Sequence, residues 1–225
     1  MKNSYLNRWC RKTWLIVSLM ISAAMTACII INWNTWSVSL KLTAAITALI
    51  PIHSSEEWYF PGGFYFQYNL FLSASEKADR YPMNRLTDMI TVFGTTLMFL
   101  AITLISAITG KTVSSGILLG GAAFSALETA FHTYCGIRAY LRYKGKGKST
   151  IYGPGSMTAY FGFLPLGILM LIQAANTTLS RTDGIAALAI LAAIAILAFA
   201  PEKFFSSPDT EFAFDGNGYY DWYMD

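Results

Sequence analysis

The chain has 225 residues, of which 54% are hydrophobic and 13% are charged. Charged residues make up about 25% of an ordinary soluble domain, so this composition excludes a soluble globular protein and indicates an integral membrane protein. The formal net charge is only +3 at pH 7, which does not by itself indicate a nucleic-acid partner.

Long apolar runs predict an all-α, polytopic helix bundle. A helix needs about 20 apolar residues to cross the hydrocarbon core of a bilayer. Such runs predict six membrane-spanning helices, at residues 14–32, 38–58, 89–109, 115–137, 157–175 and 183–200. The second reaches full length only if it continues past Ile52 through residues 53–58. We expect one transmembrane domain over residues 1–200 and a separate acidic, aromatic tail over 201–225.

The first run also has some features of a signal peptide. Basic residues precede it, and residues 25–28 (Met-Thr-Ala-Cys) loosely resemble a lipoprotein cleavage site. The apolar run continues past Cys28 to Ile31, however, and it is longer than the usual hydrophobic region of a signal peptide. We therefore interpret it as an uncleaved anchor helix. Cys10, Cys28 and Cys135 lack CxxC spacing and predict neither a disulfide framework nor a thiolate metal site.

The distribution of Lys and Arg predicts the orientation. With six spans and the N-terminus inside, 13 basic residues fall in cytoplasmic segments, and Lys41, Lys111 and Arg181 fall on the other side. Because basic residues near span ends are retained in the cytoplasm, we expect both termini there, in a multi-pass protein of the plasma membrane. The basic run at residues 142–148 lies at a span end, so we expect it to contact anionic lipid headgroups, not nucleic acid.

The chain has two histidines, and each lies one helical turn from an acidic residue in apolar surroundings. His53 begins the sequence His-Ser-Ser-Glu56-Glu57, and His132 follows Glu128 by four residues. An ionisable group at membrane depth costs at least a few kcal/mol unless it is paired or ligated. Helical residues four apart share a face, and the predicted topology places both clusters near the cytoplasmic side. We therefore expect them to form one site.

Two imidazoles and several carboxylates are ligands that suit zinc, iron or manganese. We predict a divalent metal ion bound by His53, Glu57, Glu128 and His132. Adjacent helical residues point about 100° apart, so Glu56 is expected to be a remaining ligand or the catalytic general base. The set is one carboxylate short of a di-metal helix-bundle site, and neither cluster has the His-Glu-x-x-His pattern of zinc proteases. The alternative is that each histidine hydrogen-bonds a neighbouring carboxylate and holds helices together.

Two further segments lie at the same predicted level. Residues 58–69 are rich in aromatic side chains and broken by Pro61 and two glycines, which is typical of an interfacial or re-entrant segment that could roof a cavity. Residues 152–158 contain Gly-Pro-Gly and open the fifth span. Such a helix start favours an anion or a developing negative charge.

These motifs resemble those of the HXXEE family of small integral membrane proteins. Residues 53–57 resemble the family signature, and residues 128–132 are similar to its second histidine block. Residues 152–159 are similar to a Tyr-Asn-Pro-Gly stretch before a Thr-Ala helix start, with Gly153 in place of Asn. The resemblance covers roughly residues 45–175. It implies a site more than an activity, because the family is mostly without assigned function.

The sequence thus predicts a metal-dependent membrane enzyme with a lipophilic small-molecule substrate in contact with membrane lipid. The alternative is a non-enzymatic transporter or accessory subunit, in which the same residues bind protons or ions or form a structural polar network. Paired halves with broken helices are frequent in transporters, and no internal repeat is evident here, which weighs against that class. The tail is expected to be loosely ordered or docked on a partner protein.

Overall fold

A computed structural model describes residues 5–224, and every regular element in this part is helical. In chain order these are α1 (Tyr5–Arg8), the π-helical turn η1 (Trp9–Thr13), α2 (Trp14–Ile31), α3 (Val38–Trp58), α4 (Phe64–Phe71), α5 (Arg85–Thr109), α6 (Ser115–Tyr143), the 3₁₀ turn η2 (Lys144–Lys146), α7 (Ser156–Thr158), the π-helical turn η3 (Ala159–Phe163), α8 (Leu164–Ala175), α9 (Arg181–Phe205) and the 3₁₀ turn η4 (Gly218–Tyr223).

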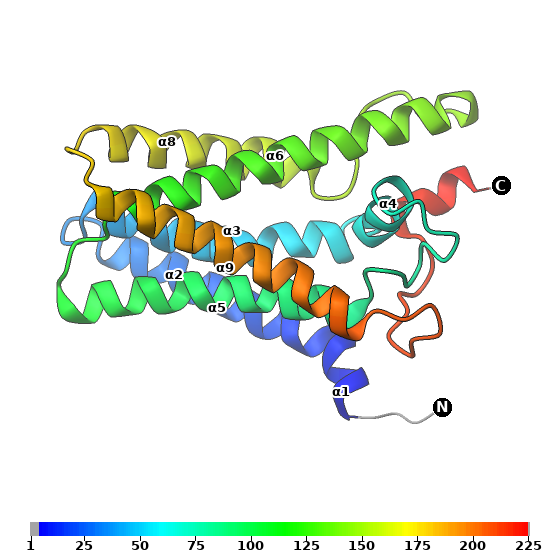
Figure 1. Cartoon of the computed structure of the whole chain (residues 1–225), viewed down its shortest axis with the longest axis horizontal. Helices are drawn as coiled ribbons and strands as arrows, with labels where there is room; N and C mark the ends of the chain where they lie inside the picture. Colours follow the sequence, from blue (N-terminus) through cyan, green and yellow to red (C-terminus); the bar gives the residue numbers. More distant parts are fainter. Residues whose placement is uncertain (1–4, 225) are drawn as a thin grey trace.

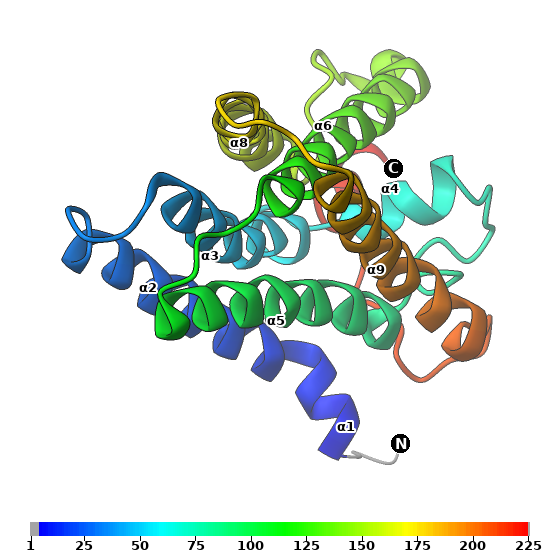
Figure 2. The ribbon, with the colours of Figure 1, turned by 60° about the vertical axis from the view of Figure 1, so that its left-hand side comes forward.

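The long helices run beside one another along the long axis of the molecule (Figure 1). Helix α3 packs against α2, α5, α6 and α8, and α9 packs against α5 and α6. The helices α3, α5, α9 and α6 therefore form a ring of neighbours (Figure 2). Both ends of the described chain lie at the same end of the bundle, together with the short helix α4 (Figure 1).

Helix starts follow local capping chemistry. The hydroxyl of Ser37 accepts a hydrogen bond from the backbone amide of Leu40 at the start of α3. Capping boxes begin α5, at Asn84, and α9, at Ser180. These side chains satisfy amides that have no partner inside the first turn of a helix. The loops before α3, α5 and α9 thus end at residues that favour helix initiation.

Five helical stretches are long and apolar enough to cross a membrane: Tyr5–Ile31, Val38–Trp58, Arg85–Thr109, Ser156–Ala175 and Arg181–Phe205. Helix α6 has 29 residues but is not among them, because its apolar run is interrupted by Glu128 and His132. The expected all-α helix bundle is therefore confirmed, with five candidate membrane spans. The count of six spans and the orientation of the termini stay predictions. The second expected span does continue through the His53 cluster to Trp58.

Small and hydroxylated side chains let α3 pack closely at the centre of the bundle. The Ser22 hydroxyl of α2 donates a hydrogen bond to the Ala48 carbonyl at 2.6 Å. The hydroxyls of Thr47 on α3 and Thr103 on α5 lie 3.2 Å apart. Small residues and interhelical hydrogen bonds are the usual means of helix association in membranes. They hold α3 in a fixed register against its neighbours.

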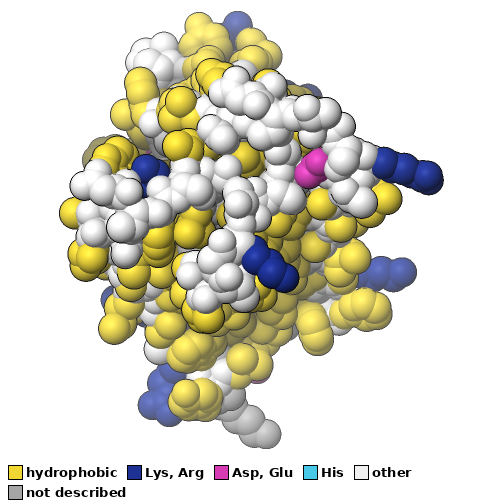
Figure 3. Space-filling model, turned by 90° about the vertical axis from the view of Figure 1, so that its left-hand side faces the viewer, with side chains coloured by type: hydrophobic (Ala, Val, Ile, Leu, Met, Phe, Trp, Pro, Cys, Tyr) yellow, Lys and Arg dark blue, Asp and Glu magenta, His cyan; other side chains and the backbone are white. Residues whose placement is uncertain are grey.

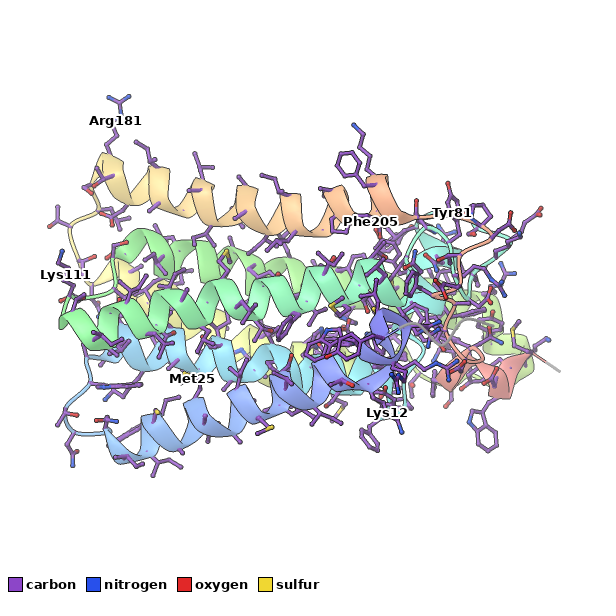
Figure 4. All side chains as sticks on the ribbon, turned by 90° about the horizontal axis from the view of Figure 1, so that it is seen from below. Lys12, Met25, Tyr81, Lys111, Arg181 and Phe205 are labelled. Atoms are coloured by element: carbon purple, nitrogen blue, oxygen red, sulfur yellow. The ribbon has the colours of Figure 1, made fainter. Side chains whose placement is uncertain are left out.

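Basic side chains separate along the bundle. Lys111 and Arg181 lie at one end, and Lys12 lies toward the other (Figure 4). The first end, which faces the viewer in Figure 3, has a mostly hydrophobic and uncharged surface with scattered Lys and Arg side chains. These three residues lie at the ends that their assignment to opposite sides predicts, and the side of the membrane that each end faces stays a prediction.

The tail differs from the expectation of a loosely ordered segment. Helix α9 continues past the expected boundary at residue 201 to Phe205. The following residues fold back on the chain: the amide of Phe214 donates to the Asp79 carbonyl at 2.9 Å, and that of Tyr219 to the Gly62 carbonyl at 3.0 Å. Tyr220 is fully buried. The tail packs against its own chain because its aromatic side chains bury apolar surface there, and its contact with another protein stays a prediction.

Candidate metal centre

The two histidine–carboxylate pairs meet between α3 and α6. The Nε2 atoms of His53 and His132 are 3.2 Å apart. Glu57 Oε1 lies 3.3 Å from Nε2 of His53 and 3.4 Å from Nε2 of His132. Glu128 Oε2 lies 3.6 and 3.7 Å from the same two nitrogens. The structure thus brings both clusters to one point, as the sequence predicts.

Three of these residues are buried and the fourth is partly open. His53, Glu57 and His132 each expose 5% or less of their surface, and they offer ligand atoms that all lie within 4.8 Å of one another. The Glu128 side chain is 25% exposed. The ring of Phe163 packs against His53 with centroids 5.0 Å apart, and that of Phe64 against His132 at 5.2 Å. These rings shield the buried polar atoms.

Glu56 points away from this cluster, toward the start of the helical stretch Ser156–Ala175. Its carboxylate accepts hydrogen bonds from the backbone amides of Met157 at 3.0 Å and Thr158 at 2.9 Å, and from the Thr158 hydroxyl at 2.6 Å. The Tyr152 hydroxyl is a fourth donor, at 3.3 Å. Burial and the neighbouring Glu56 carboxylate raise the pKa of Tyr152, which keeps this donor protonated. The anion that the sequence predicts at this helix start is therefore Glu56 itself.

A chain of hydrogen bonds orients His53. Its Nδ1 atom lies 2.7 Å from the Thr158 hydroxyl. The Glu56 carboxylate is an acceptor, so the Thr158 hydroxyl donates its proton to Glu56 and accepts the Nδ1 proton of His53. Nε2 therefore faces the cluster, and it carries a lone pair there when the imidazole is neutral.

A close backbone approach holds His132 on the other side. Gly155 has a φ of +88°, and a Cβ atom there would lie 2.1 Å from Cε1 of His132. Only glycine allows the chain to pass the imidazole in this conformation. Nδ1 of His132 is buried and has no hydrogen-bond partner within the described chain.

The tail supports the turn that contains Gly155. The hydroxyl of Tyr220 donates to Gln67 Oε1 at 2.6 Å, and Gln67 Nε2 donates to the Pro154 carbonyl at 3.3 Å. Gln67 also fills the space beside Gly153, where a Cβ atom would lie 2.6 Å from its Oε1. Gln67 and Tyr220 belong to no motif recognisable in the sequence, and Thr158 stands out there only as the last residue of the segment 152–158. The position of the Thr158 hydroxyl close to the Gly-Pro-Gly turn was the one sequence signal that could have indicated its role.

A cavity of about 790 Å³ adjoins the cluster. His53, Glu57 and Glu128 line it, and Phe64 and Tyr68 of α4 close one part of its wall. The aromatic segment that follows α3 therefore contributes to a cavity wall, as its composition indicates. Most of the remaining lining residues are apolar.

Comparison with known proteins bears on this region. A family model described as a protein of unknown function with an HXXEE motif matches residues 44–170, more than half of the chain. The match contains both histidines, the glutamates near them (Glu56, Glu57 and Glu128) and the turn at residues 153–155. Neither the curated proteins nor the solved structures contain a significant match.

Proposed function

The chain belongs to the HXXEE family, and we propose that its two histidines and neighbouring glutamates bind a divalent metal ion at which a lipophilic molecule reacts. We infer zinc, iron or manganese as the ion, with zinc the first to test. In this proposal the protein is a multi-pass membrane enzyme with six spans and both termini in the cytoplasm. The plasma membrane is its proposed location.

One observation carries the proposal: the spacing of the ligand atoms. A zinc ion with bonds of about 2.0–2.1 Å to nitrogen in tetrahedral geometry places its ligand atoms about 3.3–3.4 Å apart. The three separations among His53 Nε2, His132 Nε2 and Glu57 Oε1 are 3.2, 3.3 and 3.4 Å. Charge-assisted hydrogen bonds would be shorter, at about 2.7–2.9 Å. The spacing therefore favours coordination over direct hydrogen bonding.

The proton arrangement at His53 supports the same conclusion. The Nε2 lone pair that Thr158 and Glu56 direct into the cluster faces the carboxylate of Glu57 at 3.3 Å. Two acceptors in contact repel each other unless a cation or a proton lies between them. Hydrogen bonds from the far nitrogen of a metal-bound imidazole are a usual second layer of metal sites.

The ligand set suggests how the site would act. Two imidazoles and one carboxylate occur together in catalytic zinc sites, which keep a fourth position for water or substrate. The metal, when bound, would polarise a substrate oxygen or acidify a bound water. Glu128 Oε2 lies 3.6 Å from His53 Nε2, and its side chain lines the cavity, so we assign Glu128 as a further ligand or as a proton acceptor. Glu56, expected from the sequence to be the base, is here a positioning residue that acts through Thr158.

Metal analysis of the purified protein tests the proposal. We expect about one zinc, iron or manganese ion per chain by elemental analysis, lost in His53→Ala and in His132→Ala. Glu57→Gln should lose the metal as well, whereas Glu76→Gln, at an exposed loop position, should retain it. Circular dichroism checks that the variants fold. A native protein without stoichiometric metal, after purification without chelators and incubation with each ion, refutes the proposal.

A non-enzymatic function is the second candidate, and the contact between the two histidines favours it. Their Nε2 atoms at 3.2 Å are within reach of one N–H···N hydrogen bond, which a metal-free transporter or accessory subunit would use as a proton site or structural network. In that case His53→Ala lowers the melting temperature, and added metal ions leave the melting temperature of the native protein unchanged. With a metal site, zinc raises the melting temperature of the native protein and not of the variant.

A further inference from the structure

The cavity beside the cluster has a second polar wall. Helices α3, α5, α9 and α6 pack in a ring, and the cavity of about 790 Å³ is lined by residues of all four. His53, Glu57 and Glu128 line it from α3 and α6, and Asp88 and Glu202 line it from α5 and α9. The space thus lies between the candidate metal ligands and a separate pair of carboxylates.

The two carboxylates are only partly satisfied by the protein. Asp88 is 3% exposed, and its Oδ2 accepts a hydrogen bond from the indole of Trp58 at 2.5 Å. Glu202 Oε2 accepts one from the Tyr68 hydroxyl at 3.0 Å. The hydrogen bonds found in residues 5–224 use one oxygen of each carboxylate and leave the other free to accept. A carboxylate that is removed from water needs a cation or a proton as partner.

The ionisable side chains of the lining are mostly acidic, and the His53 imidazole is the one basic group among the described residues that line it. Four carboxylates line the cavity, and none of the described residues that line it is Lys or Arg. Two of the four, Glu57 and Glu128, lie beside the histidine nitrogens. Asp88 and Glu202 remain, on the helices that face them. The cavity is therefore built for a molecule that brings positive charge to this wall.

Most of the rest of the wall is apolar. It includes Val92 of α5, Leu127 of α6, and Leu191, Ile194 and Phe199 of α9. A charged headgroup alone would leave this surface in contact with water, whereas an aliphatic chain would cover it. A bound molecule must therefore combine an apolar chain with a cationic group.

We propose that the cavity binds an amphiphilic amine, with its ammonium group between Asp88 and Glu202 and its aliphatic chain along α6 and α9. Binding itself requires no metal. The same cavity also brings this molecule to the candidate metal centre. We therefore infer that the amine is the substrate as well, an inference that rests on the proposed function.

The experiment compares dodecylamine, 1-dodecanol and dodecanoate, each titrated into the full-length protein in detergent while tryptophan fluorescence is recorded. Because the Trp58 indole contacts Asp88, it should report binding, and Trp58→Phe supplies the blank. We expect the amine to bind with a dissociation constant roughly tenfold or more below that of the alcohol, the contribution of a charge-assisted hydrogen bond. Equal binding of amine and alcohol, or tighter binding of dodecanoate, overturns the inference.

Two variants and a control locate the preference. Asp88→Asn and Glu202→Gln should each remove most of the preference for the amine, and Glu76→Gln should keep it. Glu202→Gln tests the site even if Asp88→Asn, which alters the contact with Trp58, fails to fold. A preference that survives in every folded variant refutes the assignment.

Each titration is made once with chelator and once with zinc, so that the two proposals fail separately. Amine binding without zinc binding supports this inference and refutes the metal centre. Zinc binding without a preference for the amine supports the metal centre and refutes this inference.

Discussion

Replacing Thr158 with valine tests the metal centre without altering a ligand. The Thr158 hydroxyl joins His53 Nδ1, at 2.7 Å, to Glu56 Oε2, at 2.6 Å. Valine has nearly the same shape but removes both hydrogen bonds. Glu56 keeps its bonds from the backbone amides of residues 157 and 158, so the helix start should survive while the His53 ring loses its orientation.

The expected loss is large enough to measure. Removing a group that orients a metal-bound imidazole typically lowers metal affinity by about 10–100-fold, which corresponds to about 1.4–2.7 kcal/mol. The buried Nδ1–H of His53 also loses its acceptor, which costs about 1–3 kcal/mol of folding stability. Thr158→Val should therefore bind zinc more weakly and melt at a lower temperature than the native protein.

Competition with a chromophoric zinc chelator measures the affinity. Thr158→Ser retains a hydroxyl and should recover most of it. Thr96→Val is the matched control, since Thr96 is fully buried and its hydroxyl donates to the Val92 carbonyl within α5. If Thr158→Val binds zinc as tightly as Thr96→Val does, the proposed orientation of His53 is refuted.

Two further variants probe the turn and the loop near the site. Gly155→Ala places a methyl group against the His132 ring at a positive φ, so a thermal melt should show a loss of at least about 1–3 kcal/mol of folding stability. The control Gly145→Ala has open space around it and should leave the stability unchanged. Equal melting temperatures of the two variants would contradict the argument. Burial lowers the pKa of Lys148 to about 8, so between about pH 8 and its unfolded pKa of about 10.4 the unfolded state binds more protons and stability rises with pH. The melting temperature of the native protein should thus rise relative to Lys148→Met across this range, and a pH-independent difference would refute the buried lysine as its cause.

The sequence predicted the helices from short-range regularities, and it predicted the meeting of the two clusters from these regularities together with the topology that Lys and Arg indicate. Apolar runs mark the helices, and a four-residue spacing places His53 and Glu57, or Glu128 and His132, on one helix face. The length of α3 was predictable for the same reason. The number of spans was less predictable, because Glu128 and His132 lower the mean hydropathy of α6.

The role of Glu56 was not predictable from spacing. Its direction depends on a helix start about one hundred residues away, whose amides compete for the carboxylate. The packing of the tail was equally hidden, since Tyr220 and Gln67 belong to no periodic pattern and meet only in the fold. Long-range contacts of single polar side chains leave no local signal in one sequence.

The contact between Tyr220 and Gln67 also has a consequence for the order in which the protein is made. Every candidate ligand, together with Thr158 and the turn at residues 153–155, has been synthesised well before residue 220 leaves the ribosome. During that interval the nascent chain contains both histidines but lacks the hydrogen bond from Tyr220 to Gln67, the residue that contacts the turn at Pro154. If the proposed metal centre exists, we expect it to hold its ion stably only late in biogenesis, after the tail has packed against the rest of the chain.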